Sequence, residues 1–130
     1  MSSEMRKWLA TGAAPGVPKP AGAYSPAVRA GNLLFVSGQI PRHPDSGEIV
    51  GSDARTQARQ ALENLAAVLR ASGASLADVV SVTVYLADEN DWGAYNEVHS
   101  TFFDSPYPAR AVVGAQLRGI LVEVSAVAAL

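Results

Sequence analysis

Two charged residues near the end of the chain interrupt otherwise apolar segments, and together they could do chemistry. Arg110 stands at the entrance of the apolar run 111–117, and Glu123 lies inside the run 120–130. An arginine presents a planar fork that matches a carboxylate, and a glutamate can act as a base or position a water. Charged side chains in buried strands need a partner or a function. The pair predicts a small pocket that holds an organic acid and does proton chemistry beside it.

A purely structural role is the alternative interpretation of these two residues. Arg110 would then cap a strand end in solvent, and Glu123 would face water on an edge strand. Unusual charges often belong to structural networks and not to active sites. The spacing of the two residues therefore leaves both interpretations open.

Composition limits the classes of protein to consider. The chain has 130 residues, 48% of them hydrophobic and 17% charged, which predicts one globular domain spanning residues 1–130. The net charge of −2 gives no electrostatic footprint for nucleic acid. The absence of cysteine excludes disulfides, thiolate catalysis and thiolate metal sites. We therefore expect a globular protein without nucleic acid as a partner.

The amino-terminal segment predicts neither export nor membrane insertion. Residues 1–7 lead into no apolar stretch of the kind that signal peptides carry, and no apolar run approaches the length of a membrane span. Residues 12–20 are rich in proline and glycine, so residues 1–20 are expected to form a weakly structured lead-in. The expectation is a cytoplasmic protein without a membrane partner.

Two hairpins are predicted, one near each end of the chain. The turn signal Gly31-Asn32 makes residues 24–37 a hairpin. The apolar runs 111–117 and 120–130 flank Arg118-Gly119, which predicts a second hairpin carrying Arg110 and Glu123.

Between these hairpins, the pattern predicts two helices and a central strand. The first helix begins at Ser52 or Asp53, which can cap it, and ends at Gly73; the second runs from Asp91 to about Phe103. The strand 79–86 should direct four apolar side chains to one face. These are Val80, Val82, Val84 and Leu86.

The resulting β-β-α-β-α-β-β order defines an α+β domain with two helices on one face of a sheet. The other face still carries apolar residues, and in so short a chain another subunit is the simplest cover for it. His99 is interpreted as a partly buried helix histidine, because no second histidine stands at metal-ligand spacing. No metal site is expected.

Several segments, in order, resemble the Rid family of reactive-intermediate deaminases, also called the YjgF or endoribonuclease L-PSP family. The segments are GAYSPAV at 22–28, LLFVSGQIP at 33–41, QARQALEN at 57–64, YNEV at 95–98 with FF at 102–103, YPAR at 107–110, and LVEV at 121–124 with AVA at 126–128. Each is weak alone, and the ordered set is specific. The resemblance covers roughly residues 20–130.

The resemblance implies a fold like that of chorismate mutase, assembled as a homotrimer with clefts between subunits. It also implies hydrolysis of enamines and imines of 2-amino acids, such as 2-aminoacrylate and 2-iminopropanoate, to a 2-keto acid and ammonia. Members similar to this chain use no metal and no organic cofactor. The partners expected from the resemblance are therefore a small 2-imino or 2-keto acid and further copies of the chain.

The resemblance also assigns roles to individual positions. Arg110 matches the arginine that clamps the substrate carboxylate, and Glu123 matches the glutamate that positions or activates water. The remaining matches are to residues that line the cleft. They are Tyr24, Ser37, Gly38 and Asn96. For Ser37 and Asn96, hydrogen bonding to nearby backbone is an equal alternative.

The chain departs from the family pattern in four places. Ala23 replaces a proline, Val112 replaces a frequent cysteine, and Ser125 replaces a second glutamate. Arg110 and Glu123 are 13 positions apart (123 − 110), about two fewer than in typical members. These differences put the substrate in question more than the reaction.

Rival functions therefore stay open. One is a metabolite-binding regulatory trimer without turnover, and another is deamination of a catabolic enamine such as an aminomuconate or a pyrimidine-derived aminoacrylate. A ribonuclease is disfavoured by the net negative charge and by the absence of a basic stripe.

Overall fold

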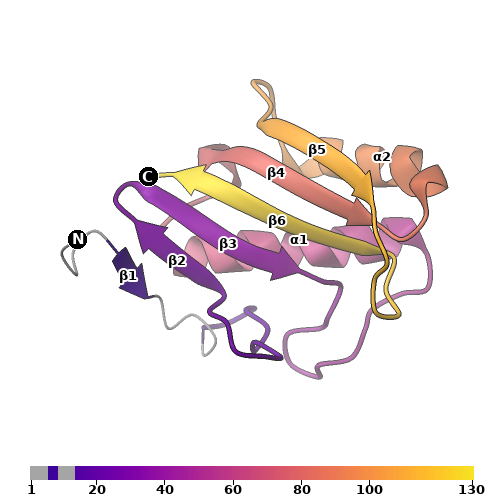
Figure 1. Ribbon diagram of the computed structural model, residues 1–130, viewed down its shortest axis with the longest axis horizontal. Coiled ribbons are helices and arrows are strands. Elements are labelled where there is room, and N and C mark those ends of the chain that lie inside the picture. Colours follow the sequence, from indigo (N-terminus) through magenta and orange to yellow (C-terminus); the bar gives the residue numbers. More distant parts are fainter. Residues whose placement is uncertain (1–5, 9–13) are drawn as a thin grey trace.

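The computed structural model describes residues 6–8 and 14–130, with side chains from residue 14 onward. Five longer strands and one three-residue strand form a single sheet in the order β1-β2-β3-β6-β4-β5 (Figure 1). The strands are β1 (Arg6–Trp8), β2 (Ala27–Ala30), β3 (Leu33–Gln39), β4 (Val79–Leu86), β5 (Ala109–Gly114) and β6 (Val122–Ala129). The helices are α1 (Ala54–Ala71) and α2 (Trp92–Phe102), and the short 3-10 turns are η2 (Leu76–Asp78) and η3 (Glu89–Asp91).

Both helices lie behind the same face of the sheet, as predicted (Figure 1). Asp53 caps α1, because its carboxylate accepts a hydrogen bond from the Thr56 amide at 2.9 Å. The helix ends at Ser72, and Gly73 follows with φ of +79°, a conformation that favours glycine. Within the described residues, neither helix is long and apolar enough to cross a membrane.

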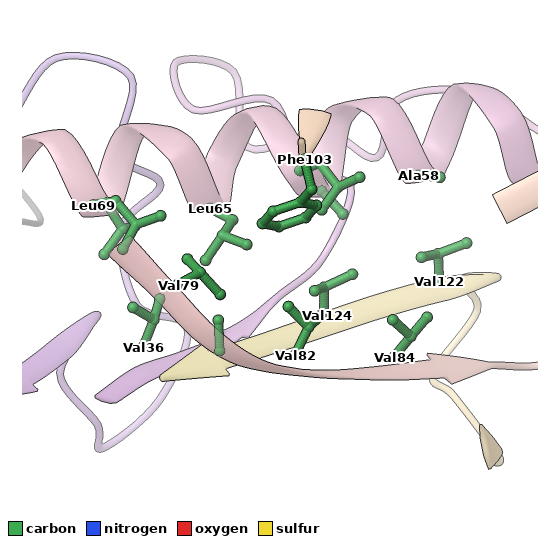
Figure 2. Close-up of a cluster of buried hydrophobic side chains, with 14 of the residues drawn as sticks. Val36, Ala58, Leu65, Leu69, Val79, Val82, Val84, Phe103, Val122 and Val124 are labelled. Carbon is green, nitrogen blue, oxygen red and sulfur yellow. The ribbon is translucent and has the colours of Figure 1, made fainter. Parts of the chain in front are cut away.

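The core lies between α1 and the central strands β4 and β6 (Figure 2). Along β6, every second side chain is buried, and Val122 and Val124 face Ala58 and Leu65 of α1. The intervening side chains of β6 are half-buried on the other face, which we call the open face. The alternation explains why β6 is mostly apolar: the strand is central in the sheet, with one face buried and the other half-buried.

The prediction of which β4 side chains share a face is wrong at the start of the strand. A bulge between Val79 and Ser81 shifts the register against β6, so Val79 is buried and Val80 is 47% exposed. From Val82 onward, the alternation follows the prediction. An extra residue in one strand reverses which face the earlier residues occupy, and periodicity alone does not reveal it.

The predicted hairpin of 111–117 and 120–130 is also wrong. β5 pairs in parallel with β4, and β6 pairs antiparallel with both β3 and β4. β4 therefore lies between the two strands that the sequence paired. Gly119 does adopt a turn conformation, with φ of +73°, but its segment crosses the end of β4 instead of closing a hairpin.

The amino-terminal lead-in differs from its prediction in one place. β1 pairs antiparallel with β2 and extends the sheet by one strand. Residues 14–20 contain no helix or strand, whereas 1–5 and 9–13 lie outside the described residues. From β2 onward, the elements follow the predicted order, including the hairpin of β2 and β3 around Gly31-Asn32.

Two buried amide side chains on α1 hold neighbouring loops. Asn64, 1% exposed, donates to the carbonyl oxygens of Ile40 and Arg42 at 3.0 and 2.8 Å. Gln57, 3% exposed, donates to the Gly51 carbonyl at 3.0 Å and accepts from the Leu121 amide at 2.7 Å. The loop after β3 and the start of β6 are thus tied to the same helix.

Candidate active site

Arg110 lies on the helix-covered face of the sheet, at its β5 edge. It is in register with Val82, whose side chain belongs to the core under the helices. Its Nη1 donates to Oδ1 of Asn96 on α2 at 2.9 Å. The Asn96 amide therefore meets the arginine and not nearby backbone, and it fixes one side of the guanidinium.

Aromatic and polar side chains surround Arg110. The guanidinium carbon is 5.5 Å from the centroid of a Trp92 ring, within the range of a cation–π contact. On the other side, a hollow of about 430 Å³ opens beside Arg110. Its lining residues are Asn96, His99, Ser100, Tyr107, Pro108 and Arg110. We call Arg110, Asn96 and Trp92 the arginine half-site.

A buried histidine stands behind the arginine half-site. His99 is 4% exposed, and its Nδ1 lies 2.8 Å from the Tyr95 hydroxyl oxygen. Burial, and secondarily the charge of Arg110, lowers the pKa of His99 to about 4. Burial raises the pKa of Tyr95. Both side chains are therefore neutral near pH 7, and Arg110 is the cation of this region.

Glu123 projects from the open face, opposite to Arg110. It is in register with Tyr85 of β4, whereas the neighbouring Val84 and Val124 are buried under the helices. Its carboxylate lies against the backbone of Gly38. A Cβ built on that glycine would be 3.0 Å from the Glu123 carboxyl carbon and still closer to one of its oxygens. The glycine at position 38 leaves room for the carboxylate in its present position, and a larger residue there would displace the Glu123 side chain.

A bulge in β3 forms the other wall around Glu123. The register of β3 against β6 shifts between Val36 and Gln39, which brings Ser37 and Gly38 out of the regular ladder. Ser37 donates from Oγ to the Ser25 carbonyl at 2.6 Å and from its amide to the Pro26 carbonyl at 2.9 Å. The hydroxyl thus serves nearby backbone while its oxygen keeps acceptor capacity.

Tyr24 lies next to this bulge. Its ring is 51% exposed, and its hydroxyl accepts a hydrogen bond from the Ala21 amide at 3.2 Å. It shares with Gly38 a hollow of about 30 Å³, which is room for one water. We call Glu123, Gly38, Ser37 and Tyr24 the glutamate half-site.

The two half-sites do not meet within one chain, contrary to the single pocket that the sequence predicted. Arg110 and Glu123 point to opposite faces of the sheet, with β4 between their strands. Neighbouring strands are about 4.8 Å apart, so the backbones of β5 and β6 are roughly 10 Å apart. A site that uses both residues therefore needs the arginine half-site of one copy and the glutamate half-site of another.

The sequence does not mark several of the residues around Arg110 as functional. Trp92 has no role assigned from the sequence, His99 is expected only as a partly buried helix residue, and Tyr107 belongs only to the segment YPAR. Trp92 is 48% exposed and Tyr107 is 60% exposed. The signal available in the sequence was a tryptophan directly after Asp91, at the predicted start of the second helix, since large aromatic residues usually find cover.

The described residues offer no obvious place for a metal ion. In 6–8 and 14–130, no three side chains of histidine, aspartate or glutamate gather closely enough to hold one. The donors at the two half-sites are an arginine, amides and a single carboxylate, which suit an organic anion and a water.

Comparison with known proteins identifies the family of the chain. Residues 14–130 match the family model described as Endoribonuclease L-PSP. A RutC family protein of Pyrococcus horikoshii is 50% identical over 113 residues, which are 85% of this chain and 90% of that protein. The human 2-iminobutanoate/2-iminopropanoate deaminase is 41% identical over 130 residues, covering 98% of this chain and 93% of the relative.

Solved structures give the same result. The crystal structure of Escherichia coli TdcF with bound serine is similar to this chain with a TM-score of 0.86 and 36% identity. The match covers 95% of this chain and 98% of the TdcF chain. Both the sequence match and the fold extend over nearly the whole domain. The chain belongs to the endoribonuclease L-PSP family, also known as the Rid or YjgF family.

Proposed function

We propose that the protein hydrolyses enamines and imines of 2-amino acids to a 2-keto acid and ammonia. The names of relatives that cover nearly its whole length support a deaminase role within the family. The observation that carries the proposal is the pair of complementary half-sites: a cation that suits a carboxylate and a carboxylate that suits a water. Such a reaction needs no metal or organic cofactor, and its substrate is a small molecule, not nucleic acid.

The arginine half-site would hold the substrate carboxylate. A guanidinium has five N–H donors, and the Asn96 amide takes one of those on Arg110. The cation–π contact with Trp92 further limits the movement of the guanidinium. A bound carboxylate would then be oriented by two parallel hydrogen bonds, which fixes the position of the neighbouring imine carbon.

The glutamate half-site would supply the proton chemistry. Glu123 takes a proton from a water whose oxygen forms a bond with the imine carbon, and it passes that proton to the imine nitrogen to give a carbinolamine. Glu123 then takes the proton of the carbinolamine hydroxyl and gives it to the amino nitrogen, so the carbon–nitrogen bond breaks, ammonia leaves and the carbon–oxygen bond becomes the keto group. The Gly38 backbone beside Glu123 limits the freedom of the carboxylate during these transfers.

The proposed assembly is a homotrimer in which each cleft joins half-sites from two subunits. Three copies related by a threefold axis can each offer Arg110 to one neighbour and Glu123 to the other. The open face supports this arrangement, because Leu33 and Phe35 are 37% and 46% exposed there. Large apolar side chains grouped on one face usually meet a partner.

Mixing two inactive variants tests the shared cleft. Arg110→Ala and Glu123→Gln should each lose activity alone. When the two are unfolded, mixed in equal amounts and refolded together, about one quarter of the clefts should combine an intact arginine with an intact glutamate from different subunits. The measurement is keto-acid release from an imine generated by an amino-acid oxidase, compared with refolded wild-type protein.

Each variant unfolded and refolded alone is the matched control, and it should stay inactive. If co-refolding restores no activity although native mass spectrometry shows mixed trimers, both residues act within one subunit or neither acts. A monomer at micromolar concentration would contradict the shared cleft directly.

A metabolite-binding role without turnover is the second candidate. The TdcF structure was obtained with serine bound, so a relative can hold an amino acid. Keto-acid affinity without any ammonia release, across imines derived from several amino acids, would favour this role. Activity confined to a catabolic enamine, such as a pyrimidine-derived aminoacrylate, would keep the reaction and change the substrate. We place the enzyme in the cytoplasm, where imines of amino acids are formed.

A further inference from the structure

A second hollow continues along β5 beyond the arginine half-site. Its volume is about 600 Å³, and it lies between the edge strand and the segment that leads into α2. Its lining residues are Leu86, Glu89, Trp92, Val112, Val113 and Gly114. Trp92 belongs to both the hollow and the arginine half-site, so the hollow begins where the guanidinium of Arg110 ends.

The hollow runs along strand β5. Arg110, Val112 and Gly114 alternate along β5 and therefore lie on the same face. The first and last are about 13 Å apart along the strand, since a strand rises about 3.3 Å per residue. Moving from Arg110, a ligand would meet apolar walls first and Gly114 last.

A carboxylate stands at the far end of this hollow. A Cβ built on Gly114 would be 2.9 Å from Oε1 and 3.2 Å from Cγ of Glu89, so the missing side chain at 114 makes room for the glutamate. In the part of the chain that the structure describes, one salt bridge forms, between Arg55 and Glu97. Glu89 forms no salt bridge there. Arg110 therefore lies beyond Trp92 at one end of the hollow, and the exposed Glu89 carboxylate lies at the other end.

We propose that this hollow takes the side chain of the substrate and that Glu89 selects a positively charged group at its end. The substrate class is then the 2-imino acids of basic amino acids, with a carboxylate on Arg110, methylene groups along Trp92 and Val112, and a guanidinium or ammonium at Glu89. This inference rests on the proposed deaminase function and specifies its substrate. Trp92 favours the same class, because an aromatic face accepts both methylene groups and cations.

The imines of arginine and citrulline provide a matched test. Their side chains have nearly the same length and shape, but one ends in a charged guanidinium and the other in a neutral urea. An amino-acid oxidase generates both imines in situ. The wild-type protein should have a higher kcat/KM for the arginine imine, and Glu89→Gln should lower the arginine-to-citrulline ratio about fivefold, as expected for a solvent-accessible ion pair.

Two further variants separate a specific effect from a general one. Glu63→Gln makes the same change of charge on the exposed side of α1, and it should leave the ratio unchanged. Gly114→Ala places a methyl group where the Glu89 carboxylate now lies, so it should lower the ratio as well. An equal fall of the ratio in Glu63→Gln would mean that net charge and not the hollow is responsible.

Binding of the keto-acid products distinguishes failure of this inference from failure of the proposed function. Calorimetry with 5-guanidino-2-oxopentanoate and 5-ureido-2-oxopentanoate needs no turnover, and the wild type should bind the first more tightly. Equal affinities, or a preference that Glu89→Gln leaves intact, would overturn the inference even if the alanine-derived imine is hydrolysed. A preference lost in Glu89→Gln, with no imine hydrolysed, would keep the inference and overturn the deaminase.

Discussion

The arginine half-site and the glutamate half-site are built in different ways. Arg110 stands at an edge strand with open hollows on both sides, and side chains from α2 hold it. Glu123 stands on a central strand and lies directly against the backbone of β3. The contrast indicates that the first region can vary with the shape of the ligand, whereas the second holds one group in one place.

The strongest test of this contrast removes the proton-transferring group. Glu123→Gln keeps the size of the side chain and loses the base, so turnover should fall about 10²–10⁴-fold, the usual contribution of a general acid or base. Affinity for pyruvate or 2-ketobutyrate should persist, because Arg110 provides that contact. Paired calorimetry and keto-acid release measure the two quantities. Full turnover in this variant would contradict the role of Glu123.

The second test removes the cation. Arg110→Ala should lower kcat/KM at least about tenfold, because a charged bidentate contact is lost. Arg110→Lys should recover little, since a point charge does not replace a fork held by Asn96. The affinity of each variant for pyruvate or 2-ketobutyrate, relative to the wild type, should fall in parallel with its activity. A fully active Arg110→Ala trimer would show that the carboxylate binds elsewhere.

The smallest expected effect concerns the histidine behind Arg110. Burial lowers the pKa of His99 to about 4 from 6.5, so the unfolded chain binds a proton more readily than the folded protein between these values. The contribution to the free energy of unfolding is therefore fully present above about pH 6.5 and is lost as the pH falls toward 4. Its upper limit is roughly 3 kcal/mol.

His99→Phe isolates this contribution, because a phenylalanine keeps an aromatic ring between Tyr95 and Phe103. The loss of stability between pH 7 and pH 5 should be smaller in the variant than in the wild type. Urea unfolding at fixed protein concentration measures it, since an oligomer's stability depends on concentration. An unchanged pH dependence would mean that His99 is not the group that titrates.

Local signals in the sequence predicted the helices and the first hairpin. Asp53 before an apolar stripe and Gly73 after it mark α1, and Gly31-Asn32 mark the turn of β2 and β3. These features depend on neighbours in the chain, so periodicity and capping identify them. The bulge at Val79 and Ser81 leaves no such signal, because it depends on how β4 pairs with β6.

The arrangement of the site depended on long-range pairing, which the sequence pattern did not contain. Two apolar runs around Arg118-Gly119 predict a hairpin equally well whether or not another strand lies between them. The registers of β5 and β6 against β4 then decide that Arg110, beside Val82, and Glu123, beside Tyr85, face opposite ways. The residue types were identified from the sequence and the resemblance, while their separation required the sheet order.

The side-chain amides of Asn64 and Gln57 on α1 align the two backbone segments that form the glutamate half-site. Asn64 holds the backbone at Ile40, two residues beyond Gly38, and Gln57 holds the backbone at Leu121, two residues before Glu123. Helix α1 therefore helps to fix the spacing of β3 and β6, the two strands whose contact positions the Glu123 carboxylate. A shift of α1 by a fraction of an ångström would change the direction in which the Glu123 carboxylate points, although, among the described residues, no hydrogen bond joins the helix to that carboxylate.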